Sequence, residues 1–172
     1  MKMAIRLQRK TEKPENHDLA GRIATFLDAH HVISLATCGP RGSHAANVFY
    51  ARNGLSLFWV SDWQSMHSRN IAINPQVSAT IAPDYSDFEE ACGVQIFGEA
   101  HQLSDTAERD GARALLATRY PTLRHLSDRP MIEHAYASAE AYRLVPNKII
   151  IIDNRRGFAH KDTLDLRPVQ KC

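Results

Sequence analysis

Hydroxyl, imidazole and guanidinium side chains gather in one short stretch of this chain, at Ser65, His67 and Arg69. The stretch directly follows residues 55–61, which are predicted to form a strand, and it opens a short segment predicted to be helical. The first turn of a helix carries unbonded backbone N–H groups and the positive end of the helix dipole, so an anion is favoured there. The sequence therefore predicts a phosphate-binding site where this strand meets this helix.

The spacing of these three side chains allows two interpretations. Ser65 and His67 lie on the same side only while the backbone is extended, whereas Ser65 and Arg69 share a face only once the helix has begun. All three converge only if the change from strand to helix falls inside the stretch. Otherwise the pattern Ser-x-His-x-Arg is a polar first turn that faces solvent. The spacing alone is compatible with both interpretations.

The elements that must position this stretch follow from periodicity and turn chemistry. A helix is predicted over the apolar positions of residues 19–27, and Asn53-Gly54 is typical of a hairpin turn. A capping box at Asp105–Glu108 opens a helix that ends before Pro121, and residues 130–140 are predicted to be a further helix. The predicted strands are residues 31–37, 44–52, 55–61, 76–82, 93–103, 140–145 and 148–153.

The patterning of these strands predicts a barrel. The apolar residues of 55–61 point to both faces of the strand, and so do those of Ile149–Ile152. Strands that are buried on both faces and joined mostly by short turns favour a closed or nearly closed antiparallel barrel, covered by helices or by a second subunit. A parallel α/β sheet is excluded, because it needs helical crossovers between its strands.

Composition and charge limit the classes of partner. A chain of 172 residues with 44% hydrophobic residues is consistent with one domain that buries its own core. Its net charge of +2 is too balanced to indicate binding to nucleic acid or to a membrane surface, and no apolar run approaches the roughly 18 residues that span a bilayer. The three cysteines are widely spaced, so no disulfide framework is expected. Without a signal peptide, the expected location is the cytoplasm.

Four sequence motifs follow one another along the chain. They are Ala46-Asn-Val-Phe-Tyr50, Trp59-Val-Ser-Asp-Trp-Gln-Ser-Met-His67 with Asn74-Pro75, Val94-Gln-Ile-Phe-Gly98-Glu, and Tyr142-Arg-Leu-Val-Pro146. In order and spacing this set resembles the pyridoxamine 5′-phosphate oxidase-like split-barrel superfamily. Asp153-Asn154 followed by Gly157-Phe158 is similar to a small uncharacterised bacterial subgroup of that superfamily. The resemblance covers roughly residues 17–160.

The resemblance implies a fold, a domain organisation and a partner. The implied fold is mainly β (α+β), a six- to seven-stranded antiparallel split β-barrel of Greek-key type with flanking helices. Residues 16–172 would form a single FMN-binding domain, preceded by a mobile N-terminal arm of residues 1–15. Because the family builds its cofactor site at a two-fold dimer interface, the implied partner is an identical chain.

The resemblance also implies how the FMN phosphate is held. Ser65 and His67 would hold it, with Met66 in the place of the family's Arg and His67 in the place of its Lys. Arg and Lys are cationic at neutral pH, whereas His is largely neutral there unless the phosphate raises its pKa. The implied phosphate site is therefore weaker in charge than in the oxidase itself, and Arg69 is the candidate that compensates.

The rest of the cofactor is implied to meet three further segments. Val60 and Ser61 would contact the ribityl chain or the ring. Asn47 and Phe49, on one side of their strand, would flank the isoalloxazine ring. Gln95 would reach the flavin or the phosphate, from the same subunit or from its partner.

The predicted function is that of an FMN-dependent oxidoreductase acting on a small molecule. No residue stands out as a general acid, base or nucleophile, which is consistent with a cofactor that performs the hydride transfer. The long C-terminal substrate-binding segment of true pyridoxamine phosphate oxidases has no counterpart, which argues against vitamin B6 oxidation. The alternative is a module that stores or senses flavin or haem without turnover.

Two residue types have competing roles. No HxxxH or HExxH spacing supports a metal site, so no metal is predicted among the nine histidines. His44, beside the proposed ring-side residues, is either a haem candidate or a polar residue at a strand edge. Trp59 could stack on a flavin, but a Trp in a barrel strand is more often in the core, and we predict a core position.

Overall fold

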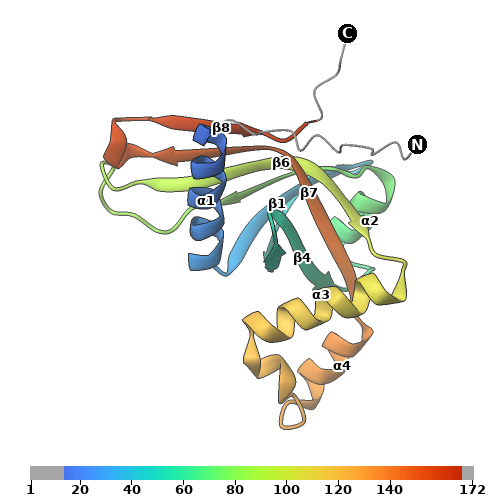
Figure 1. Cartoon of the computed structure of the whole chain (residues 1–172). Helices are drawn as coiled ribbons and strands as arrows, with labels where there is room; N and C mark the ends of the chain where they lie inside the picture. The colour runs from blue at the N-terminus through green and yellow to red at the C-terminus, as the bar shows by residue number, and fades with distance from the viewer. Residues whose placement is uncertain (1–13, 168–172) are drawn as a thin grey trace, which may run out of the picture.

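The computed structural model describes residues 14–167, with side chains from residue 18 onward. Within that range one antiparallel sheet of eight strands curls around a core, and helices flank it (Figure 1). This mainly β architecture confirms the predicted split-barrel class. Residues 1–13, most of the predicted N-terminal arm, lie outside the described residues.

The order of the strands in space differs from their order in the chain. Across the sheet it runs β2-β1-β5-β6-β7-β4-β3, and β8 also pairs with β7. Every pairing is antiparallel, as the short connections predict. The bounds are β1 Val32–Gly39, β2 Gly42–Phe49, β3 Ala51–Asn53, β4 Ser56–Ser61, β5 Gln76–Ile81, β6 Cys92–Gln102, β7 Glu140–Asp153 and β8 Lys161–Asp165.

The barrel is split between β2 and β3, the two ends of the strand order. These strands are consecutive in the chain and separated by Tyr50 alone. The prediction of one strand over residues 44–52 is therefore wrong, because β2 pairs with β1 whereas β3 pairs with β4. Tyr50 is fully buried, and its hydroxyl donates to the Leu27 carbonyl oxygen at 2.6 Å. This bond fixes the corner of the sheet.

Strand β7 holds the two parts of the sheet together. It runs unbroken through Pro146, although the sequence predicts a separate strand on either side of that residue. The register shifts opposite it at Gly98, where an added Cβ would lie only 2.2 Å from the Val145 carbonyl oxygen. The first part of β7 pairs with β4 and the later part with β8, a strand that the sequence analysis did not predict.

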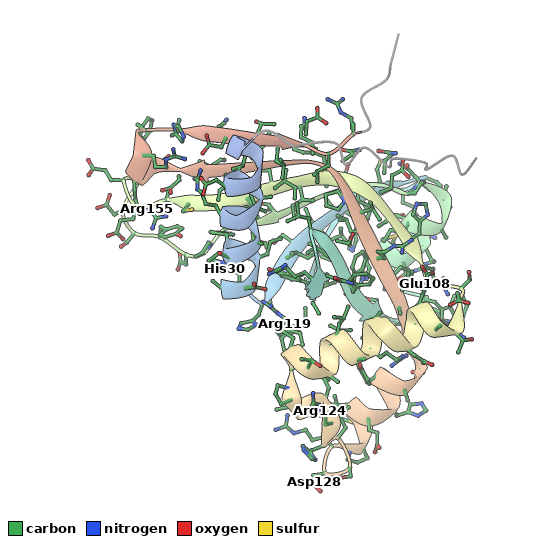
Figure 2. The ribbon with its side chains drawn as sticks, viewed as in Figure 1. His30, Glu108, Arg119, Arg124, Asp128 and Arg155 are labelled. Carbon is green, nitrogen blue, oxygen red and sulfur yellow. The ribbon has the colours of Figure 1, made fainter. Side chains whose placement is uncertain are left out.

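Helix α1 (Pro14–Ala29) packs on the inner face of the sheet. Its residues Leu19, Ile23 and Leu27 are buried among inward-facing strand side chains. At the C-terminal end of the helix, Arg119 donates to the carbonyl oxygens of Leu27 and Asp28, at 3.0 and 3.1 Å. Figure 2 shows Arg119 beside this end of α1. A guanidinium group there satisfies carbonyls that have no partner within the helix and complements its dipole.

Residues 106–138 form a helical arm beside the barrel. It comprises α3 (Thr106–Arg119), the short 3₁₀ helix η1 (Pro121–Arg124) and α4 (Pro130–Ser138). The Asp105 carboxylate accepts a hydrogen bond from the Glu108 N–H at 3.0 Å, which confirms the predicted cap of α3. In Figure 1, α3 lies next to the ends of β4 and β7, and α4 lies farther from the sheet. No helix within residues 14–167 combines the length and the apolar character that crossing a membrane requires.

Candidate functional site

Ser61, Ser65 and His67 meet where β4 ends and α2 (Met66–Ile73) begins. Ser65 caps the helix: its backbone is extended, with φ −60° and ψ 154°, and its hydroxyl oxygen accepts from the Ser68 N–H at 3.3 Å. The same hydroxyl lies 3.1 Å from Nε2 of His67, and this ring nitrogen also hydrogen-bonds with the Ser61 hydroxyl at 2.8 Å. The change from strand to helix thus falls inside the stretch, which brings Ser65 and His67 together.

His67 is almost fully buried in this cluster, with 8% of its surface exposed. Burial, followed by the neighbouring His44, holds the pKa of His67 below its usual value. The two imidazole rings are nearly parallel, at 5°, and their centroids are 6.4 Å apart. His67 is therefore neutral near pH 7 in the free protein. An anion placed beside the ring would favour its protonated form.

The start of α2 offers further donors to an anion. In the part of the chain that the structure describes, the backbone N–H groups of Met66 and His67 have no hydrogen-bond acceptor. They lie at the positive end of the helix dipole, beside the hydroxyls of Ser61, Ser65 and Ser68. Backbone N–H groups, hydroxyls and an imidazole are together the donors that a phosphate group needs.

Helix α2 is fixed against the β1–β2 hairpin by Asn70. The Asn70 side-chain amide donates to the Thr37 hydroxyl at 3.1 Å, and both side chains are buried. Gly39 lies against the same amide, where an added Cβ would be only 2.2 Å from Asn70 Oδ1. Glycine at this position allows the helix to approach the hairpin closely, and this approach sets the position of the cluster.

A cavity of about 420 Å³ opens beside the cluster, between β2 and β4. This volume falls within the range of small-molecule sites, roughly 300–1,000 Å³. Larger hollows of about 520 and 660 Å³ border α3 and α1, but none of the predicted site residues lines them. The cavity is lined from the barrel by Asn47, Val48, Phe49, Val60, Ser61 and His67, and from the helical arm by Leu116, Tyr120, Thr122, Leu123 and Tyr136.

The strand edges at the cavity carry backbone groups without a partner strand in residues 14–167. Strand β2 pairs only with β1, and β3 covers β4 only as far as Phe58. The Tyr50 N–H donates to the His31 carbonyl oxygen, so this backbone N–H is directed toward β1. Because this direction alternates along an antiparallel strand, Asn47 and Phe49 direct their N–H and C=O groups away from β1. The cavity thus meets backbone donors and acceptors as well as side chains.

Four predicted site residues do not line the cavity. Ser65 is half-buried behind the wall, where its hydroxyl bonds with His67. Met66 is half-buried in the first turn of α2, and Arg69 is exposed with no hydrogen bond from its guanidinium within residues 14–167. Gln95 is half-buried on the outer face of β6. Of the competing roles for Trp59, the core position is confirmed, because its side chain is fully buried and stacks on Tyr142.

The helical arm contributes a wall of the cavity that was not predicted from the sequence. The Tyr120 hydroxyl lies within hydrogen-bond distance of the Tyr50 and His31 carbonyl oxygens, at 2.7 and 3.0 Å, and its ring meets Phe49 edge-on. These contacts join segments that are far apart in the chain. The Tyr120-Pro121 pair marks the end of a helix, but it carries no information about the surface that this end meets.

Comparison with known proteins identifies a matching family model, sequence relatives and solved structures with a similar fold. Residues 19–143 match the family model described as Pyridoxamine 5′-phosphate oxidase. A UPF0306 protein from Yersinia pestis bv. Antiqua is 29% identical over 141 residues, covering 81% of this chain and 88% of the relative. A heme binding protein from Mycobacterium smegmatis has a TM-score of 0.67 at 22% identity, over 90% of this chain and 60% of that one. An FAD-binding protein from Mesorhizobium loti has a TM-score of 0.56 at 19% identity, over 76% of this chain and 89% of that one.

Proposed function

This chain belongs to the pyridoxamine 5′-phosphate oxidase family, and from that premise we propose that it binds FMN and acts as a flavin-dependent oxidoreductase on a small molecule. The proposed position of the FMN phosphate is the β4–α2 junction, against Ser61, Ser65 and His67. The observation that carries the proposal is the hydrogen-bonded cluster that these residues form at a helix N-terminus, where Ser61 and His67 line a cavity.

The groups on the remaining walls of the cavity have the chemical character that a flavin ring requires. A flavin ring is flat and apolar over most of its surface, with donors and acceptors along one edge. Asn47 and Phe49 offer an amide, an aromatic ring and outward-directed backbone groups, and Val60 adds an apolar surface. The relatives with solved structures include one named as FAD-binding, which supports a flavin as the ligand class.

When bound, FMN would supply the hydride transfer, and the protein would supply binding, orientation and electrostatics. Ser65 and the first backbone N–H groups of α2 would orient the phosphate. His67 would take up a proton as the phosphate binds, because its pKa is depressed in the free protein and a nearby negative charge opposes that depression. The helical arm would shield this side of the cavity from water.

We further propose that a second copy of this chain covers the outer face of the sheet. One row of polar, uncharged side chains crosses this face in register and points away from the core: Asn47, Ser34, Thr80 and Gln95. Val32 and Phe49 are exposed beside it. An uncharged row of this kind on a sheet face suits packing against a second sheet, and the partner would bring Gln95 near the cofactor of its neighbour.

Absorbance and mass spectrometry test the flavin proposal. Protein incubated with FMN and then desalted should retain the flavin absorbance bands, and the ligand released from freshly purified protein should have the mass of FMN. A protein that stays colourless after this incubation contradicts the proposal. Stopped-flow mixing of the loaded protein with NADH or NADPH then tests turnover: rapid bleaching supports the oxidoreductase, and no bleaching supports a flavin-binding module without turnover.

Haem binding is the second candidate function. It is favoured by the nearly parallel rings of His44 and His67 and by the heme binding protein among the similar structures. Titration with haem should then produce a Soret band that is lost in a His44→Ala variant. A titration that gives only the spectrum of free haem argues against this candidate.

A further inference from the structure

The cavity has two chemically different sides. On the barrel side, polar groups of His67, Ser61 and Asn47 lie beside the apolar side chains of Val48, Phe49 and Val60. On the side of the helical arm the lining side chains are aliphatic, aromatic or hydroxylated: Leu116, Tyr120, Thr122, Leu123 and Tyr136. No Lys, Arg, Asp or Glu among the described residues lines the cavity. The wall of the helical arm therefore offers no charge to a ligand.

The charged groups of the helical arm are directed elsewhere. Arg113 donates to the Tyr136 carbonyl oxygen at 2.9 Å, with its guanidinium 4.9 Å from the centroid of that ring. Arg119 donates to the C-terminal carbonyls of α1. Arg124 and Asp128 lie toward the tip of the arm, away from the barrel (Figure 2). The two guanidinium groups nearest the wall thus hold α4 and α1 in place.

The polar groups that remain on this wall are hydroxyls, which can form hydrogen bonds but supply no counter-charge. The Tyr120 hydroxyl already lies against two backbone carbonyls. The hydroxyls of Thr122 and Tyr136 can bond a carbonyl or hydroxyl group, but they cannot compensate a full charge. An ion placed here would lose its hydration without a counter-charge, which is unfavourable.

We infer that the helical arm selects an uncharged, planar second ligand that carries no more than carbonyl or hydroxyl groups. The edge-on rings of Phe49 and Tyr120 give such a molecule aromatic surface to pack against. The inference rests on the proposed flavin function, since this ligand shares the cavity with FMN. It argues against a phosphorylated substrate, because the cluster around His67 is already assigned to the phosphate of FMN.

The test compares two planar probes of similar size, coumarin and coumarin-3-carboxylate. Calorimetric titration of the FMN-loaded, full-length protein should give a dissociation constant lower for coumarin by about tenfold or more. A Thr122→Arg variant adds a cation to the wall at an exposed position and should reverse this preference. A Thr118→Arg variant, which adds the same cation beside the separate hollow next to α3, should keep the preference of the unmodified protein.

Three results would overturn the inference: carboxylate binding as tight as that of coumarin, no binding of either probe, or a preference that Thr122→Arg leaves unchanged. Failure of the proposed flavin function is recognised separately, because the flavin bands are absent after desalting. In that case the two probes are compared in the FMN-free protein with inorganic phosphate added to occupy the cluster around His67, and the same preference is expected.

Discussion

His67 is the residue of the cluster that can change its charge near neutral pH. The proposed phosphate site contains Met66 and His67, and it carries no fixed charge apart from the exposed Arg69. Burial keeps the His67 ring neutral in the free protein. Phosphate binding at the proposed site is therefore expected to be linked to proton uptake by this one imidazole.

Acidification should destabilise the folded protein through His67. The pKa of His67 is below its usual value in the folded state, because burial disfavours the charged ring, whereas the unfolded chain titrates at about 6.5. The contribution of the neutral His67 ring to the free energy of unfolding is therefore fully present above about pH 6.5. It is lost as the pH falls through the lower pKa of the folded state. Urea denaturation at about pH 7.5 and about pH 5.5 measures this loss.

A His67→Gln variant should lose less free energy of unfolding over that pH range than the unmodified protein. The matched control is His125→Gln, because His125 is exposed and lies outside the cluster. The control should reproduce the behaviour of the unmodified protein. Equal losses in His67→Gln and the unmodified protein would show that His67 is not the group responsible.

At the scale of the element, the position of α2 depends on the close approach at Gly39. A Gly39→Ala substitution places a Cβ 2.2 Å from Asn70 Oδ1, so it should lower the free energy of unfolding by about 1–3 kcal/mol, the range for overpacking. Combining it with Asn70→Ala removes the clash, and the double variant should lose less than the sum of the two single losses. Chemical denaturation measures all three.

Gly21→Ala is the matched control for that experiment. An added Cβ at Gly21 meets no atom within 4 Å, and the residue lies inside helix α1. Alanine there should stabilise the protein by about 0.5–1 kcal/mol, because glycine is a poor helix former. A Gly39→Ala protein as stable as the unmodified one, with α2 still in place, would contradict the role assigned to this contact.

The β4–α2 junction was predictable because its signals are local. A strand pattern, a Ser in a capping position and a polar first turn all occur within residues 55–69. The corner at Tyr50 was not predictable in this way, because the strand pattern continues through residues 44–52 and only pairing with two different strands reveals the break. Likewise β7 passes through Pro146 because Gly98, on another strand, permits the bulge.

At the scale of the whole molecule, the site is assembled from three parts that are distant in sequence. The edge of β2, the β4–α2 junction and the helical arm meet at one cavity. The first two parts contain sequence motifs and were predicted. The third depends on how Arg119 and Tyr120 join the arm to α1 and to the corner at Tyr50, which no local pattern encodes.

The molecular mass of the protein in solution tests the proposed dimer. Light scattering after size-exclusion chromatography should give the unmodified protein twice the mass of one chain. Thr80 is exposed in the middle of the outer sheet face, so Thr80→Arg should reduce the mass to that of one chain by burying an unpaired charge in the contact. Ser104→Arg, at an exposed position outside the sheet, is the control and should remain a dimer. A single-chain mass for the unmodified protein would rule out this assembly.

The most direct test of the account compares FMN with riboflavin, which lacks the phosphate. Calorimetric titration of a His67→Ala variant should show FMN binding weakened by about 1–3 kcal/mol, the range for hydrogen bonds to charged groups, while riboflavin binding is nearly unchanged. His101→Ala, which removes an exposed imidazole, should leave both affinities unaltered. Equal losses for the two ligands, or no loss for FMN, would contradict the claim that the β4–α2 junction binds the phosphate.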